Sequence, residues 1–92
     1  MKVRIKASGR VQGVGFRYTT VQLAQDAGIF GTVKNETDGS VTIEAVGEKA
    51  AIDHFIAALK KQPRNPFAQV QHLEINEDET IKDYTSFNVI YY

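Results

Sequence analysis

Two stretches of helical spacing, each standing between strand-like stretches, limit the folds open to this chain. Apolar residues recur every three or four positions from Phe16 to Ala27 and again over residues 50–59. Runs that are typical of strands, either alternating apolar and polar residues or rich in β-branched ones, occupy residues 2–8, 29–35, 40–46, 70–75 and 86–92. The predicted order is therefore strand, helix, strand, strand, helix, strand, with one further strand at the end.

This order predicts an α+β fold of the ferredoxin-like, split βαβ type with an added C-terminal strand. Right-handed crossovers would place both helices on one face of an antiparallel sheet. Gly28 marks the end of the first helix, and Pro63 and Pro66 mark the end of the second. The alternation of the fourth strand slips once near His72, which predicts a bulge, and residues 76–84 are expected to be exposed.

Charge and composition restrict the partners of such a domain. Eleven basic and eleven acidic side chains give zero formal net charge, which argues against holding nucleic acid or an anionic membrane by bulk electrostatics. There is no cysteine, and neither His54 nor His72 has a matching partner for a metal site. The first residues have no long apolar run, so neither a signal peptide nor a membrane span is expected. We expect one cytoplasmic, monomeric domain over residues 1–92.

The glycine-rich stretch S-G-R-V-Q-G-V-G-F-R-Y, residues 8–18, joins the first strand to the first helix and is the strongest candidate for a site. Backbone without side chains, followed by fixed positive charge, lets an anion such as phosphate approach main-chain amides. Arg17, in the first helical turn, can direct a two-pronged guanidinium at the same anion. The residues whose amides would form the cradle are Gln12, Gly13, Val14, Gly15 and Phe16.

The loop by itself leaves more than one interpretation open. It lacks the lysine of a Walker A loop, and Tyr18 stands where a dinucleotide fingerprint has its third glycine. The glycines could also serve only a tight strand-to-helix turn, with Arg10 and Arg17 on the solvated face. A phosphate cradle and a plain turn therefore both fit these residues.

A wider set of residues resembles the acylphosphatase family over essentially the whole chain. It consists of G-R-V-Q-G-V-G-F-R (residues 9–17), V-K-N (33–35), D-G-S-V (38–41) and the ending F-N-V-I-Y-Y. The resemblance implies hydrolysis of the carboxyl–phosphate bond of small acyl phosphates to a carboxylate and inorganic phosphate, without a metal or organic cofactor. It also implies that the loop backbone binds the phosphoryl group, that Arg17 clamps it and that Asn35 holds the attacking water.

Three further points concern the surroundings of this site. Family members commonly carry tryptophan where this chain has Thr32, and we expect the change to affect packing beside Asn35 and thereby substrate fit or rate. Arg10 could assist the anion or cap a turn. The terminal carboxylate, at Tyr92, could pair with Arg17 and orient its guanidinium.

The residue types fit this chemistry. Neither a guanidinium nor a carboxamide exchanges a proton usefully near neutral pH, so Arg17 and Asn35 supply no general acid. An acyl phosphate needs none, because it expels a carboxylate whose conjugate acid has a pKa of roughly 4, whereas a phosphate monoester expels an alkoxide. The acyl group itself is not specified by the sequence, and discrimination among carboxyl phosphates is expected to be weak.

Two other classes of function remain open. A nucleic-acid-binding module of the same element order would stack bases on aromatic residues of its central strands, but residues 2–8 and 40–46 contain none. A regulatory module, or a relative of the acylphosphatase-like domains inside larger maturation enzymes, would bind a phosphate-containing ligand without turning it over. Steady-state turnover separates that case from an enzyme.

Overall fold

The computed structural model describes residues 1–63 and 65–91, in which five strands and two helices form an α+β domain. The elements are β1 (Lys2–Arg10), α1 (Phe16–Ala27), β2 (Phe30–Asn35), β3 (Val41–Val46), α2 (Lys49–Lys61), β4 (Gln69–Glu77) and β5 (Phe87–Ile90). Every element expected from the periodicity is present, and β4 extends further than its apolar residues indicated.

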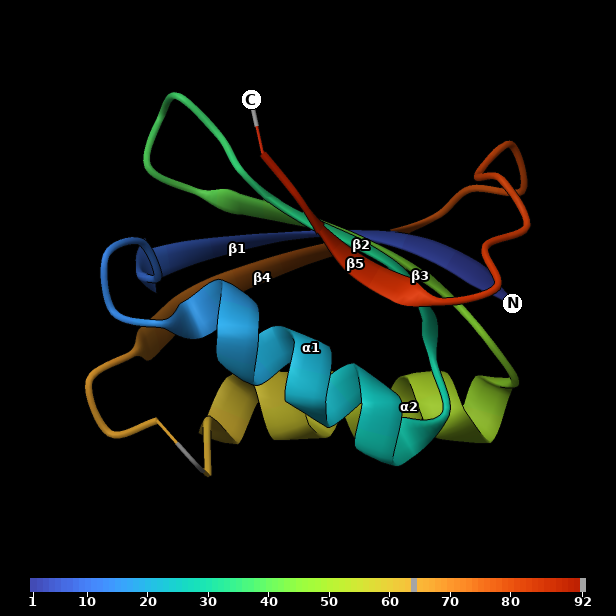
Figure 1. Ribbon diagram of the computed structural model, residues 1–92, viewed down its shortest axis with the longest axis horizontal. Helices are drawn as coiled ribbons and strands as arrows, with labels where there is room; N and C mark the ends of the chain where they lie inside the picture. Colours follow the sequence, from blue (N-terminus) through green and yellow to red (C-terminus); the bar gives the residue numbers. More distant parts are fainter. Residues whose placement is uncertain (64, 92) are drawn as a thin grey trace.

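The five strands form one sheet in the order β4-β1-β3-β2-β5. The first four strands pair antiparallel, as expected, but β5 pairs parallel with β2, so the sheet is mixed rather than wholly antiparallel. The reason is the path of the chain, which leaves β4 at one edge and crosses to the other edge (Figure 1). Since β4 and β2 run in opposite directions, a strand that returns after this crossing runs parallel to β2. The ferredoxin-like arrangement itself is confirmed.

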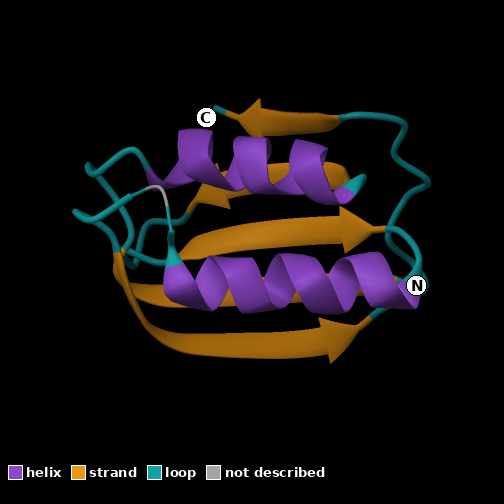
Figure 2. Cartoon of the chain, turned by 90° about the horizontal axis from the view of Figure 1, so that it is seen from below, coloured by secondary structure: helices purple, strands orange, loops and turns teal. Residues whose placement is uncertain are grey.

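Both helices cover one face of the sheet, as Figures 1 and 2 show, and the core lies between the two layers. The helical spacing read from the sequence accounts for the buried side chains of α1 and α2, among them Phe16, Leu23 and Phe55. The ring of Phe55 meets that of Phe87 from β5 edge to face, with 6.0 Å between centroids. Full burial of each such large side chain contributes about 1.5–3 kcal/mol to stability.

Local signals in the sequence also hold in the structure. The bulge expected near His72 is present, because Ser8 pairs with His72 while Gly9 pairs with Val70, which leaves Gln71 as the extra residue. Gly28 ends α1 in the left-handed conformation, with its amide bonded to the carbonyls of the last helical turn.

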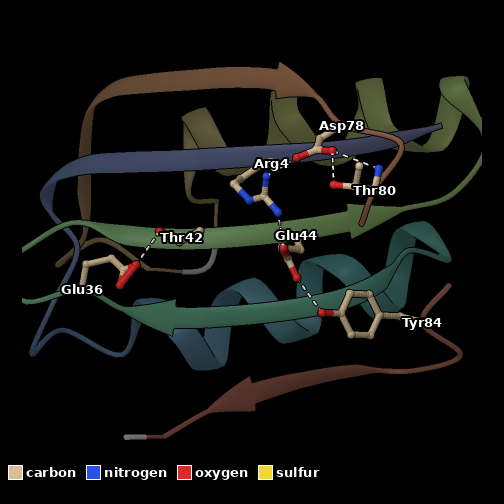
Figure 3. Close-up of polar contacts among 7 residues, drawn as sticks. All are labelled: Arg4, Glu36, Thr42, Glu44, Asp78, Thr80 and Tyr84. Atoms are coloured by element: carbon tan, nitrogen blue, oxygen red, sulfur yellow. Dashed lines mark hydrogen bonds and ion pairs between the residues drawn. The ribbon is translucent and has the colours of Figure 1, made fainter. Parts of the chain in front are cut away.

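The other face of the sheet carries a polar network instead of helices (Figure 3). The guanidinium of Arg4 bonds to Glu44, at 2.6 Å, and to Asp78, and the Tyr84 hydroxyl donates to Glu44 at 2.5 Å. These contacts draw the crossing segment onto the sheet, and Ile81 within it is only 3% exposed. The expectation that residues 76–84 are exposed is therefore wrong for this part of the segment.

Hydrogen bonding shifts the acidic groups of this network. The pKa of Asp78 is lowered to about 2, first by the side chain and backbone amide of Thr80 and then by Arg4. For Glu44, burial alone would raise the pKa, but the bonds from Tyr84 and Arg4 outweigh it and the pKa is lowered. A carboxyl whose pKa is lower in the folded than in the unfolded protein stabilises the fold above its unfolded pKa and loses that contribution as the pH falls.

We expect Asp78→Asn to lower the Tm at pH 7, because the variant lacks the carboxylate that bonds Arg4 and Thr80. The difference from wild type should shrink as the pH falls from 3.8 to about 2, the ordinary and the lowered pKa of Asp78. Thermal unfolding by circular dichroism at several pH values measures both effects. Asp53→Asn, which breaks an exposed pair with Lys49, is the control and should change the Tm little. A deficit of Asp78→Asn that stays constant down to pH 2 would contradict the assignment.

Candidate active site

The glycine loop takes a conformation that exposes its backbone. Gly13 and Gly15 have φ values of 74° and 77°, in the left-handed region that other residues adopt only with strain. A Cβ placed on Gly13 would meet nothing within 4 Å, so the space beside the backbone is open. Gly15 is also the N-cap of α1, and no side chain caps it. The glycines thus serve both the turn and an open approach to the main chain.

The amides of this loop are available to a ligand. In the part of the chain that the structure describes, we find no acceptor for the backbone N–H groups of residues 13–17. Such free amides at the start of a helix carry the positive end of its dipole and bind anions. The loop can therefore offer several amides to one anion.

The side chain of Gln12 makes contacts that are separate from the expected role of its backbone amide. Its side-chain amide donates to the carbonyls of Glu36 and Ser40, both at 2.8 Å, and so ties the loop to the turn that follows Asn35. The glycine-rich loop and the end of β2 are therefore held together by this side chain.

Arg17 lies in the first turn of α1, as expected, and its side chain is partly buried. The guanidinium stacks over the ring of Tyr91 at 5.1 Å from the ring centroid, a contact that restricts the orientation of the cation. The expected partner at the C-terminus, the carboxylate of Tyr92, lies outside the described residues.

Asn35 is the last residue of β2, where the strand pairs with Val41 of β3. Its side-chain oxygen is buried and has no hydrogen-bond donor within the described residues. A buried acceptor without a donor is unfavourable by about 1–3 kcal/mol, and ordered water commonly satisfies such a group. The Asn35 oxygen is thus suited to accept a hydrogen bond from a water molecule.

One pocket of about 460 Å³ brings the two motifs together. Gly13, Gly15, Phe16, Arg17 and Asn35 line it, whereas Gln12 and Val14 do not. Sequence reasoning missed the remaining walls, which come from Val11 in the loop, from α1 and from the C-terminal strand: Val11, Tyr18, Val21, Gln25, Phe87, Asn88, Val89 and Tyr91. The helical spacing from Arg17 to Val21 and Gln25 was a usable signal, and the ending F-N-V-I-Y-Y belonged to the family resemblance, but its residues 87–91 were not assigned to the pocket.

Thr32 and Arg10, which the sequence analysis placed near the site, do not line the pocket. Thr32 lies on the face of the sheet that carries the polar network. It is opposite Glu44 in the strand pairing and within hydrogen-bonding reach of Tyr84. Side chains three positions apart in a strand point to opposite faces, so the expected packing of Thr32 beside Asn35 is wrong. Arg10 is exposed at the end of β1 and does not line the pocket.

Across residues 1–63 and 65–91, no group of three or more histidine, aspartate or glutamate side chains is arranged to hold a metal ion. Neither α1 nor α2 is long and apolar enough to cross a bilayer.

Fold and site together define a ferredoxin-like α+β domain with a pocket at the N-terminus of its first helix. The sequence model of the acylphosphatase family matches residues 3–89. An acylphosphatase of Lactobacillus gasseri is 47% identical over 89 residues, 97% of each chain. The crystal structure of acylphosphatase from Bacillus subtilis superposes with a TM-score of 0.90 and 37% identity over 98% of each chain. The chain belongs to the acylphosphatase family, and the resemblance read from its motifs is confirmed.

The same domain also matches part of a longer protein. T. kodakarensis HypF is similar with a TM-score of 0.87 and 30% identity, over 99% of this chain but 12% of HypF. The fold therefore also occurs as one domain of a longer chain.

Proposed function

We propose that this protein is a metal-independent acylphosphatase that hydrolyses small acyl phosphates to a carboxylate and inorganic phosphate. The observation that carries the proposal is the shared pocket, which the loop residues with free amides, Arg17 and Asn35 line together. The buried Asn35 oxygen, which has no donor within the described residues, adds an unused acceptor beside it. Family membership supports the reaction type. The roles of the individual residues rest on the geometry of the pocket.

In the proposed mechanism, the amides of residues 13–17 and Arg17 bind the phosphoryl oxygens. These donors neutralise charge on the equatorial oxygens, which dominates catalysis of phosphoryl transfer. The Asn35 oxygen accepts a hydrogen bond from water and aligns it with phosphorus. As the water oxygen bonds to phosphorus, the bond from phosphorus to the acyl oxygen breaks, and its electron pair leaves with the carboxylate. The proton of the water passes to a phosphoryl oxygen of the substrate.

The acyl end of the substrate faces the outer wall of the pocket. Tyr18 and Tyr91 are 68% and 75% exposed, and both line the pocket, so this end is open to solvent and to acyl groups of different sizes. We propose that a monomer suffices, with small molecules as its substrates and without nucleic acid or membrane partners. The zero net charge of the chain supports the last point.

Phosphate release from benzoyl phosphate, in buffer containing excess EDTA, tests the proposed function. We expect steady-state turnover of this acyl phosphate and none of an alkyl phosphate such as ethyl phosphate, because the alkoxide that the ester expels would need protonation. A protein that binds phosphate but does not turn over benzoyl phosphate would instead be the non-catalytic module. Activity that EDTA abolishes and Mg²⁺ restores would refute the metal-independent mechanism.

A further inference from the structure

We propose that Asn65 and Thr19 are positioning residues that orient two successive peptide groups of the phosphate loop. Asn65 lies in the connection from α2 to β4, which approaches the loop at the same end of the molecule in Figures 1 and 2. Thr19 lies in α1, one turn after the loop. The inference rests on the proposed function, since it assigns these residues to the same site.

Asn65 has a fully used set of hydrogen bonds although it is only 6% exposed. Its side-chain nitrogen donates to the carbonyl oxygen of Val14 at 2.9 Å and to the hydroxyl of Thr19 at 3.1 Å. Its side-chain oxygen accepts from the amides of Phe67 and Ala68. The side-chain oxygen thus stabilises the connection that contains Asn65, while both hydrogen bonds of the side-chain nitrogen go to the glycine-rich loop and to α1.

Thr19 continues this chain of bonds. Its hydroxyl, in a side chain that is 5% exposed, donates to the carbonyl oxygen of Gly15 at 2.9 Å. A helical threonine often bonds the carbonyl four residues earlier. Here the same hydroxyl also accepts from Asn65, so that two adjacent carbonyls, of Val14 and Gly15, are held from one side.

The orientation of the amides follows from the planar trans peptide. In such a peptide the C=O and the following N–H point in opposite directions. Holding the carbonyl of Val14 toward Asn65 therefore turns the amide of Gly15 away from it, and holding the carbonyl of Gly15 does the same for the amide of Phe16. Gly15 and Phe16 both line the pocket. The two side-chain bonds, together with the helical bond from the Thr19 amide to the Gly15 carbonyl at 3.1 Å, thus direct successive amides at the proposed phosphoryl site before substrate arrives.

The chain offers a matched pair of variants at adjacent positions. Thr19→Val removes the hydroxyl of this network with almost no change of shape. Thr20→Val makes the same change one residue later, at a hydroxyl that is buried and has no partner within the described residues, so it should leave activity unchanged. Thr19→Ser keeps the hydroxyl and should restore function.

The test combines kinetics with phosphate binding followed at single amides. We expect Thr19→Val to lower kcat/KM for benzoyl phosphate by about ten-fold or more, the size typical of lost outer-shell orientation. In ¹⁵N–¹H spectra, inorganic phosphate should shift the amides of Gly15 and Phe16 in wild type, with Kd weakened about ten-fold in Thr19→Val. The double variant Asn65→Ala/Thr19→Val should have a kcat/KM no more than slightly below that of Asn65→Ala alone, since the two residues act as one unit.

The outcomes separate this inference from the proposed function. Weaker phosphate binding by Thr19→Val supports the positioning role even if wild type does not turn over benzoyl phosphate. Conversely, the wild type could be active while kcat/KM and Kd of Thr19→Val lie within two-fold of the wild-type values. That result would overturn the positioning role and leave the enzyme assignment intact. Equal losses in Thr19→Val and Thr20→Val would also overturn it, because they would indicate a general packing effect.

Discussion

Replacing either Arg17 or Asn35 by alanine is expected to lower kcat/KM for benzoyl phosphate by at least about 10²-fold. One preorganised donor to a developing anion accounts for about 10²–10³ in rate in other enzymes. Arg17 supplies the only mobile cation that we identify in the pocket lining among the described residues. Asn35 supplies the donor-less oxygen. Arg17→Lys should lose most of the activity too, since an ammonium cannot reproduce the planar, two-pronged guanidinium.

Steady-state phosphate release, with circular dichroism to verify folding, measures these losses. Arg10→Ala is the matched control, because it removes an arginine at the other end of the same loop that does not line the pocket. We expect the kcat/KM of this control to stay within about two-fold of the wild-type value. Such a result would argue against a role of Arg10 in assisting the anion and favour a role in capping the turn. If folded Arg17→Ala and Asn35→Ala retain wild-type activity, the residue assignment is wrong.

The largest effect on stability is expected for Gly31→Ala. Gly31 lies in β2 between β3 and β5, with φ of 151°, and a Cβ there would stand 1.7 Å from the carbonyl oxygen of Glu44. Overpacking in a core usually destabilises by about 1–3 kcal/mol. A collision with backbone of the central sheet has less room to relax, so we expect a loss of about 3 kcal/mol or more.

Urea unfolding at equilibrium measures this loss. Gly39→Ala provides the control, because Gly39 also has positive φ, 91°, but a Cβ there meets nothing within 4 Å. At that position the substitution should cost only the strain of an alanine at positive φ, about 1–2 kcal/mol of stability. Equal destabilisation by the two substitutions would contradict the steric argument at Gly31.

Local patterns predicted the elements because each depends on nearby residues. Helical spacing located α1 and α2, and Gly28 and the slip near His72 marked a helix end and a bulge. The parallel pairing of β5 could not be read in this way, since it depends on where the crossing segment takes the chain. The burial of Ile81 in that segment was missed for the same reason.

The candidate site was only partly accessible from sequence. Arg17, Asn35 and the glycines were identified from their motifs, and the structure brings them into one pocket. Asn65 was missed because its bond to Val14 joins residues 51 positions apart and its surroundings match no motif. The error about Thr32 came from sequence proximity to Asn35, which strand alternation overrides.

Hydrolysis of benzoyl phosphate in H₂¹⁸O with excess EDTA tests the central claim most directly. Because the pocket is proposed to hold water in line with phosphorus, wild type should place one ¹⁸O in the inorganic phosphate released and none in the benzoate, as mass spectrometry of both products would show. Label in the benzoate would mean attack at the carbonyl carbon. That result would contradict the proposed roles of Asn35 and of the loop.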